Sequence, residues 1–254
     1  RRDGRPPVAQ VYELTAGAPP RRLFETHAGR LGLDAAAVAP LGDDVLVSLT
    51  DRQAPPAQAP DAPADDYDAP ACLWETVTRI ELRDRRSGAL KASREIRGLD
   101  VTAALSRGKA ALLAGAETPA CGAERRAVVL RIGPDLHPQT LYRDDSLGES
   151  WAWSLSAMPG GRVFVAASKR AVVDVRPVAA SPEAAVAAVA GLPTGTSGMA
   201  LVLDAHGVAS SPRLLEAGAD VFVNGADASR PDDILLAGGL GGRPVIFHLR
   251  AAGP

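Results

Sequence analysis

The chain has 254 residues, a formal net charge of −2 and a hydrophobic fraction of 46%. This length and composition allow one large β domain or two small ones with a substantial core, and they exclude wholesale disorder. The near-neutral charge argues against a nucleic-acid partner, and no apolar run approaches the roughly 18–20 residues that a membrane-spanning helix requires.

The first predicted elements are two strands joined by a turn. Residues 8–14 form an alternating strand, Ala16 and Gly17 supply the turn, and residues 21–25 form a more polar strand. We name these two strands C and D, because the same pair returns later in the chain behind two further strands, A and B.

Strands A and B are predicted from a tight polar turn followed by a short apolar run. Gly, Pro and Asp supply the turn backbone, and the apolar run is typical of a strand that is buried on both faces. The turns with their apolar runs are 41–49, 106–114, 159–167 and 230–238. The C and D strands that follow are 76–82 with 90–96, 126–132 with 139–142, 199–203 with 212–216, and a last C strand at 243–249.

The chain therefore has the strand order C-D, then A-B-C-D three times, then A-B-C. Four antiparallel strands in about 40–50 residues, repeated, predict the blades of a β-propeller. Strand D is the most polar and is expected at the outer edge. We predict an all-β fold of about four to five blade equivalents, with residues 1–254 as a single propeller domain or part of a larger ring; the alternative is a β-sandwich built of hairpins.

One segment carries a family resemblance. Residues 232–239 read Asp-Asp-Ile-Leu-Leu-Ala-Gly-Gly, which resembles the repeats of bacterial secreted propellers of the kelch-like and delta-60 kind. In those repeats, a turn with Gly and Asp precedes an Ile-Leu-Val-Ala-Gly strand. The resemblance implies a propeller that works in the extracellular space, in the periplasm or at the cell surface.

Two B–C connections are long, at residues 52–71 and 181–197. The first is rich in Ala, Pro and Asp, and the second contains a predicted short Ala-rich helix that begins with Ser-Pro. Loops of this length often carry function, so we predict that the B–C loop face is the binding surface; the alternative is that both loops are tolerated insertions. The binding-face candidates are Asp65, Asp66, Tyr67, Asp68 and Trp74.

Cys72 and Cys121 stand at equivalent places, a few residues before two successive C strands. Equivalent loops of adjacent blades are neighbours in space, so we predict a disulfide between them. A bridge that closes about 50 residues would stabilise the fold by about 3–4 kcal/mol and would imply an oxidising compartment. The alternative is a pair of buried free thiols.

Carboxylates also recur near the starts of the A strands. Asp34, Asp100, Glu149 and Asp220 occupy nearly matching positions, one in each blade. At the mouth of a propeller channel they could converge on a cation such as Ca²⁺, whereas ordinary turn chemistry is the alternative.

The arginine pairs Arg21-Arg22, Arg85-Arg86 and Arg125-Arg126 are scattered along the chain, and we interpret them as solvated strand or turn positions.

Nucleophile elbows, phosphate-binding loops and metalloprotease helices are absent from the sequence. The favoured hypothesis is a non-catalytic binding or assembly module of a secreted or cell-envelope protein, without a cofactor. It would hold a protein or glycan partner on the B–C loop face, within a larger envelope assembly. The alternative is a propeller enzyme, lactonase-like or quinoprotein-like, with a cation or substrate at the channel mouth.

Overall fold

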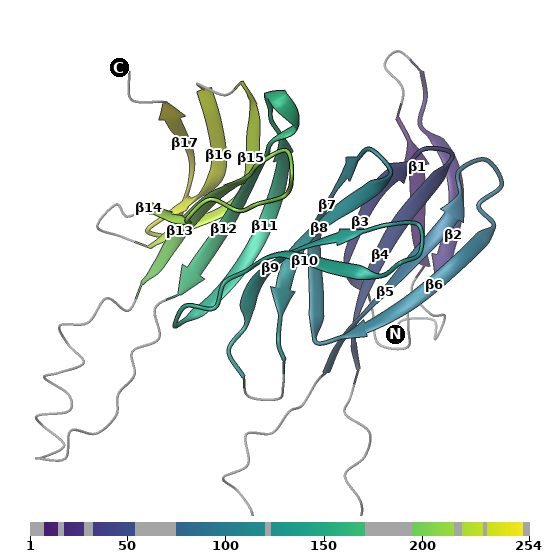
Figure 1. Ribbon diagram of the computed structural model, residues 1–254, viewed down its shortest axis with the longest axis horizontal. Helices are drawn as coiled ribbons and strands as arrows, with labels where there is room; N and C mark the ends of the chain where they lie inside the picture. Colours follow the sequence, from purple (N-terminus) through teal and green to yellow (C-terminus); the bar gives the residue numbers. More distant parts are fainter. Residues whose placement is uncertain are drawn as a thin grey trace, which may run out of the picture. The chain divides into compact units, whose positions relative to one another are not determined.

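The computed structural model describes residues 8–14, 18–27, 33–53, 75–119, 123–170, 195–215, 220–230 and 233–250. Within these ranges the regular structure is β-strand, apart from one turn of 3-10 helix at Pro159–Gly161 (η1) (Figure 1). The predicted all-β class is therefore confirmed for the described residues. The long connections 54–74 and 171–194, with the helix predicted in the second, lie outside them.

The strands follow the predicted repeat closely. Their bounds are β1 Val8–Glu13, β2 Arg21–His27, β3 Leu33–Leu41, β4 Asp44–Gln53, β5 Glu75–Asp84, β6 Leu90–Arg97, β7 Leu99–Arg107, β8 Ala110–Glu117, β9 Arg126–Ile132, β10 Pro138–Arg143, β11 Glu149–Ala157, β12 Val163–Arg170, β13 Thr196–Leu203, β14 Arg213–Leu215, β15 Val221–Arg230, β16 Asp233–Leu240 and β17 Arg243–Arg250.

In the described chain these strands form a series of sheets in sequence order. The orders are β1-β2, β3-β4-β5-β6, β10-β9-β8-β7, β11-β12-β13-β14 and β15-β16-β17. This is the predicted series of one C-D pair, three A-B-C-D sheets and one A-B-C sheet. The prediction of four-stranded antiparallel sheets is confirmed.

The A strands share a feature that the sequence pattern did not reveal. Each has a shift in register against its B strand, which indicates a β-bulge. The shifts lie between Leu33 and Ala35, Val101 and Ala103, Ala152 and Ser154, and Val223 and Gly225. The bulge is thus part of the repeat, and it bends every A strand near its N-terminal end.

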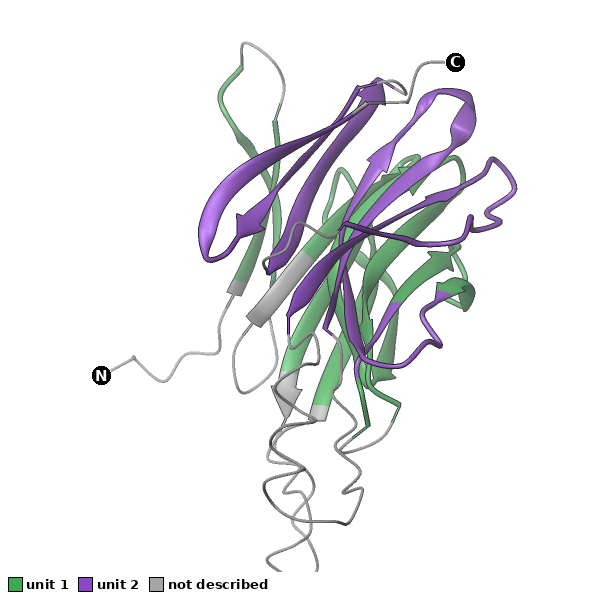
Figure 2. Cartoon of the chain, turned by 90° about the vertical axis from the view of Figure 1, so that its left-hand side faces the viewer, with its two compact units in different colours: residues 1–124, 128–142 green, residues 125–127, 143–254 purple. Residues whose placement is uncertain are grey.

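The chain divides into two compact units (Figure 2), residues 1–124 with 128–142 and residues 125–127 with 143–254. In unit 1 the sheets β3–β6 and β7–β10 pack through an apolar layer that includes Leu46, Ile80, Leu113 and Ile132. The ribbon β1–β2 adds a smaller cluster, in which Phe24 packs with Val47. In unit 2 the sheet β11–β14 packs on the sheet β15–β17 through a third cluster.

Buried hydroxyls join successive sheets in unit 1. Val101 N–H donates to Thr50 Oγ1 at 3.3 Å, and Thr78 Oγ1 donates to the Leu99 carbonyl at 2.6 Å. The two threonine oxygens are 2.8 Å apart. Because the single Thr78 hydrogen is directed at Leu99, Thr50 must be the donor to Thr78. The relay satisfies the backbone of β7 from the side chains of β4 and β5.

Unit 2 uses serines at the corresponding place. Ser168 Oγ on β12 accepts from Val223 N–H at 3.1 Å and lies 3.3 Å from the Val223 carbonyl, to which it donates. Ser154 and Ser156 on β11 accept from the N–H groups of Ala226 and Ala228 at 3.2 Å and 2.8 Å. In both units, hydroxyls of one sheet therefore hydrogen-bond to the first strand of the next sheet.

Candidate functional site

A hollow of about 220 Å³ opens on unit 1. Its lining comes from the facing ends of β1 and β2, the β3–β4 turn and the β5–β6 turn, and every lining residue is charged. These residues are Glu13, Arg21, Asp43, Arg85 and Arg86. The two turns are tied together, because Arg85 N–H donates to the Asp43 carbonyl at 3.0 Å.

Glu13 holds two of the three arginines. Arg21 donates to its carboxylate from Nε at 3.1 Å and from Nη2 at 2.5 Å, and Arg85 forms an ion pair with the other oxygen. The hydrogen bonds from Arg21 and then from Arg85 hold the pKa of Glu13 below its ordinary value. The side chains of Arg21 and Arg85 are 59% and 42% exposed, so these ion pairs position the arginines more than they stabilise the fold.

Arg86 is the free cation of the hollow. Its side chain is exposed, and no ion pair or side-chain hydrogen bond engages the guanidinium within the described residues. Three arginines face two carboxylates, which leaves a net positive charge. A guanidinium with a planar fork of free donors is suited to a carboxylate or another oxyanion.

The β5–β6 turn that carries Arg85 and Arg86 is fixed by Asp84. Its Oδ1 accepts from Ser87 N–H at 2.8 Å, from Ser87 Oγ at 2.8 Å and from Arg86 N–H at 3.1 Å. The backbone hydrogen bond from Ser87 is the main reason why the pKa of Asp84 falls to about 2. Gly88, with φ of +72°, completes the turn, and a Cβ there would lie 2.6 Å from Cβ of Phe24.

A buried ionic group attaches β2 to β5 beside this turn. Glu81 accepts from Arg83 Nε at 2.7 Å and from Thr26 Oγ1 at 2.9 Å, and it pairs with Arg79 at 2.9 Å. Arg83 also donates to the Gly88 carbonyl at 2.8 Å and lies over the Phe24 ring, 5.3 Å from its centroid. The ribbon and the turn that line the hollow are therefore held by one network.

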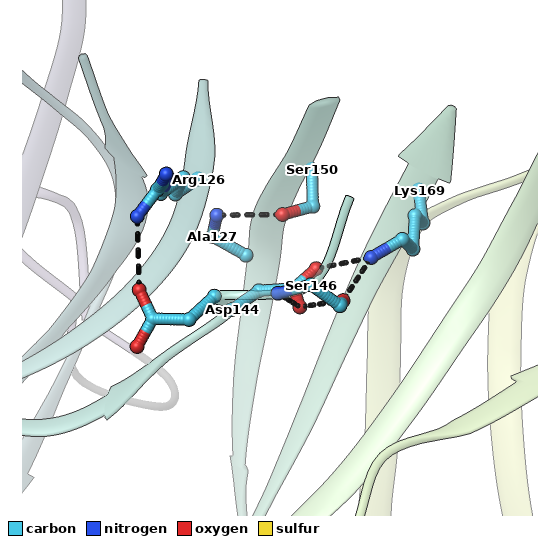
Figure 3. A network of polar contacts seen from close by, with 7 residues as sticks. Arg126, Ala127, Asp144, Ser146, Ser150 and Lys169 are labelled. Atoms are coloured by element: carbon cyan, nitrogen blue, oxygen red, sulfur yellow. Dashed lines mark hydrogen bonds and ion pairs between the residues drawn. The ribbon is translucent and has the colours of Figure 1, made fainter. Parts of the chain in front are cut away.

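A second polar cluster lies in unit 2, in the loop before β11 (Figure 3). Lys169 Nζ donates to Asp144 Oδ2 at 3.0 Å and also to Ser146 Oγ, and Ser146 N–H donates to Asp144 Oδ1 at 3.2 Å. Burial raises the pKa of Asp144, but hydrogen bonds from Ser146, Lys169 and Ser150 together hold it below its ordinary value. Ser146 Oγ in turn donates to the Asp144 carboxylate, so the three side chains form a closed network that anchors the loop.

The same loop is attached to the start of β9. Ser150 Oγ accepts from Ala127 N–H at 2.8 Å (Figure 3). Asp144 N–H donates to the Ala127 carbonyl at 2.9 Å, and Arg126 pairs with Asp145 at 3.0 Å. These contacts provide hydrogen-bond partners for backbone groups at the start of β9 and in the loop before β11. The cluster is therefore a structural clasp.

The structure describes the immediate neighbours of three of the four predicted channel-mouth carboxylates. Asp220 Oδ1 accepts from Thr196 N–H at 2.9 Å, which is turn chemistry at the start of β13. Glu149 stands opposite Arg170 and Asp100 opposite Ala116 in their ladders, and the side chain of Asp34 lies outside the described residues. Among the described residues, no three His, Cys, Asp or Glu side chains gather closely enough to hold a metal ion.

The other predicted site residues fall outside the described ranges. They are the binding-face candidates Asp65, Asp66, Tyr67, Asp68 and Trp74, and the cysteines Cys72 and Cys121 of the predicted disulfide. The B–C binding face and the disulfide remain predictions.

The sequence pattern does not predict the hollow. The arginine pairs are scattered along the sequence and predict solvated positions, whereas the structure brings Arg21 and Arg85 onto Glu13. The available signal is the place of Arg85 and Arg86 in a C–D turn, since the C–D and A–B turns share one end of a four-stranded sheet.

No helix in the described part of the chain is long and apolar enough to cross a membrane.

No protein-family model matches the sequence, and no curated protein matches it. Solved structures resemble it at low identity. An acylaminoacyl peptidase of Pyrococcus horikoshii has 9% identity and a TM-score of 0.42, with 95% of this chain and 40% of that chain covered. A mutant of the apocarotenoid oxygenase of Synechocystis has 8% identity and a TM-score of 0.44, with 95% of this chain and 55% of that chain covered. The chain thus spans about half the length of these proteins or less, and the comparisons show no family.

Proposed function

We propose that the chain is a non-catalytic binding or assembly module built of propeller blades, within a secreted or cell-envelope protein. The observation that carries this proposal is the repeated seam between sheets. Buried hydroxyls on one sheet, such as Thr50 and Ser168, bond to the backbone of the next A strand. Such seams make a rigid scaffold, and rigid scaffolds are what position variable binding loops.

The partner in this proposal is a protein or a glycan held by the B–C loops. In each four-stranded sheet the antiparallel order brings the B–C connections to the end opposite the A–B and C–D turns. The connections after β4 and β12 are the long ones in sequence, and loops of this length often carry function.

The test compares the wild-type chain with a chain that lacks residues 54–70 on an array of neutral and acidic glycans and on immobilised envelope proteins. We expect the deletion to abolish binding and to leave the melting temperature almost unchanged. A variant in which a Gly-Ser linker of equal length replaces residues 54–70 shows whether binding depends on the residues of the loop or on its length. Undiminished binding by both variants would contradict the role of this loop.

The hollow favours a second mode of binding for the same module. The free guanidinium of Arg86, beside the Glu13-bound pair Arg21 and Arg85, is suited to a carboxylate on an acidic glycan or peptide. On the same array, Arg86→Ala should weaken binding of carboxylate-bearing glycans about tenfold, in line with the loss of one charge-assisted hydrogen bond. Arg131→Ala removes the same charge from an exposed position on β9 and should have no effect. Equal loss in both variants would indicate only a general charge effect.

A further inference from the structure

Glu13 engages two of the three arginines that line the hollow and leaves the third free. Its Oε2 accepts from Arg21 Nε and Nη2, and its Oε1 pairs with Arg85. Arg86 has no such partner within the described residues. The Nε–Nη2 side of Arg21 is one of the two sides on which a guanidinium holds a carboxylate. A carboxylate of the chain itself therefore already occupies it.

The fold holds these partners in place from both sides. Glu13 and Arg21 are the last cross-strand pair of the β1–β2 ladder, so they stand opposite each other whenever the ribbon is formed. Arg85 belongs to the β5–β6 turn, which Asp84 fixes through its side chain and which the hydrogen bond from Arg85 N–H ties to the Asp43 carbonyl. An incoming anion therefore meets two guanidiniums that are already positioned and partly neutralised.

The charge of the hollow is close to balance. Three arginines and two carboxylates, Glu13 and Asp43, leave one positive charge among the lining residues. Hydrogen bonds from its two arginines hold the pKa of Glu13 below its ordinary value, so this carboxylate is ionised at neutral pH. Beside the lining residues in the chain, Asp44 and Asp84 share Lys91, which adds no net positive charge. One negative charge on a ligand is therefore enough to neutralise the lining.

A weakly positive site discriminates between ligands by their charge. The attraction grows in proportion to the charge of the ligand, whereas the cost of removing the ligand from water grows with the square of that charge. A dianion therefore needs a strongly positive site or several guanidiniums at once. In the hollow, two of the three guanidiniums are engaged by Glu13.

We propose that Glu13 restricts the hollow to ligands whose bound group carries one negative charge, such as a carboxylate or a sulfate monoester, by occupying Arg21 and Arg85. This selectivity rests on the proposed binding of anions at Arg86 and adds the residue that determines it. A group with one charge pairs with the free fork of Arg86. A second charge finds no free guanidinium and stays uncompensated, which is specificity by exclusion.

The test is a titration of the whole chain with two pairs of small anions at neutral pH and constant ionic strength. Acetate and methyl sulfate carry one negative charge, and malonate and sulfate carry two. The arginine Nε–H signals in two-dimensional NMR spectra report binding, and the amide signals establish that each variant is folded. In the wild-type chain, the dissociation constants of sulfate and methyl sulfate should differ by less than about threefold, because the desolvation of the dianion offsets its stronger attraction.

Glu13→Gln keeps an acceptor oxygen and removes the charge that holds the arginines. If it tightens methyl sulfate and acetate about threefold, it should tighten sulfate and malonate about tenfold, because the electrostatic free energy of a dianion changes twice as much. Asp43→Asn removes one charge from the same hollow, but Asp43 forms no ion pair with these arginines in the described residues, so the gain for dianions should be smaller. Glu25→Gln is the matched control outside the lining, since Glu25 pairs with Arg22 on the same ribbon.

The outcomes separate this selectivity from the proposed function. Loss of acetate binding in Arg86→Ala places the anion in the hollow, and unchanged acetate binding would refute both the binding mode at Arg86 and its selectivity. If Arg86→Ala abolishes binding but Glu13→Gln leaves the ratio of sulfate to methyl sulfate affinity unchanged, only the role of Glu13 is refuted. Equal gains in Glu13→Gln and either Asp43→Asn or Glu25→Gln would also refute it, because charge alone would then explain the change. A wild-type chain that binds sulfate more than about tenfold more tightly than methyl sulfate would show that the hollow does not select for one charge.

Discussion

The strands β4 and β5 of unit 1 and the strands β16 and β17 of unit 2 are the same pair in the repeat, and they differ in burial. Both pairs start with an aspartate, Asp44 in β4 and Asp233 in β16, and carry apolar residues at matching ladder positions. The first pair lies between two sheets and has both faces covered, whereas the second pair is covered on one face in the described structure. In the described structure, burial of a residue at a given place in the repeat therefore depends on whether another sheet covers its face, and the apolar pattern alone does not determine it.

We expect the largest effect on the free energy of unfolding when the two matched isoleucines, Ile80 and Ile246, are each replaced by alanine. Ile80→Ala should reduce the free energy of unfolding by about 2–5 kcal/mol, because it opens a cavity in a close-packed layer. Ile246→Ala should cost less than about 0.5 kcal/mol, because its side chain is 68% exposed. Urea unfolding followed by fluorescence measures both. Equal losses in the free energy of unfolding would mean that Ile80 and Ile246 are equally buried, which would contradict the difference between the two strand pairs.

The second effect concerns the glycines opposite the bulges. A Cβ at Gly115 would lie 1.9 Å from the Asp100 carbonyl oxygen, and a Cβ at Gly238 would lie 1.9 Å from that of Phe222. Both substitutions to Ala force the bulge to move, at about 1–3 kcal/mol. We expect Gly115→Ala to cost more, because the covered sheet has less room to adjust. Gly239→Ala, whose Cβ would make an ordinary 3.5 Å contact, is the control and should be nearly neutral.

The repeat made the strand order predictable, because each turn and each apolar run is a local signal. The A-B-C-D series and the antiparallel pairing follow from such signals alone. The bulge at Trp153 does not, because it depends on the geometry of the paired strand and not on a turn residue. Strict alternation would place Trp151 and Trp153 on the same side of the strand, and the register shift between Ala152 and Ser154 removes the basis for that expectation.

The candidate site was less predictable than the fold. The hollow joins Glu13 to Arg85 across 72 positions in the chain, and no local pattern encodes a contact of that separation. The A-strand carboxylates illustrate the opposite problem. Their recurrence suggests a shared cation, and this stays a prediction; Asp220 hydrogen-bonds a neighbouring turn, and a recurring polar residue can also serve each repeat separately.

The third effect is at the hydroxyl seam. Thr78→Val keeps the shape of the side chain and removes the donor to Leu99, leaving a buried carbonyl and the Thr50 hydroxyl without this partner. We expect a loss of about 1–2 kcal/mol in unfolding free energy. Thr78→Ser retains the hydroxyl and should recover most of it. If Thr78→Ser is as unstable as Thr78→Val, the methyl group rather than the relay stabilises the seam.

The smallest effect is the pH dependence of the clasp in unit 2. The pKa of Asp144 is lower in the folded chain than its ordinary value, which is about 3.9 in an unfolded chain. Its contribution to stability is therefore complete above that value and is lost as the pH falls through the lower folded-state pKa. Asp144→Asn should cost about 1 kcal/mol at pH 7 through the weakened hydrogen bonds from Lys169 and Ser146, and the difference from wild type should narrow below about pH 4.

The neighbouring carboxylate provides the control for this pH dependence. Asp145 is exposed and pairs with Arg126 at the surface, so Asp145→Asn should shift unfolding by less than about 0.5 kcal/mol. Thermal melts of the wild-type chain and both variants, from about pH 2.5 to about pH 7, cover the range in which the Asp144 carboxylate changes its charge. A gap between wild type and Asp144→Asn that stays constant across that range would mean that the Asp144 charge contributes nothing to the clasp.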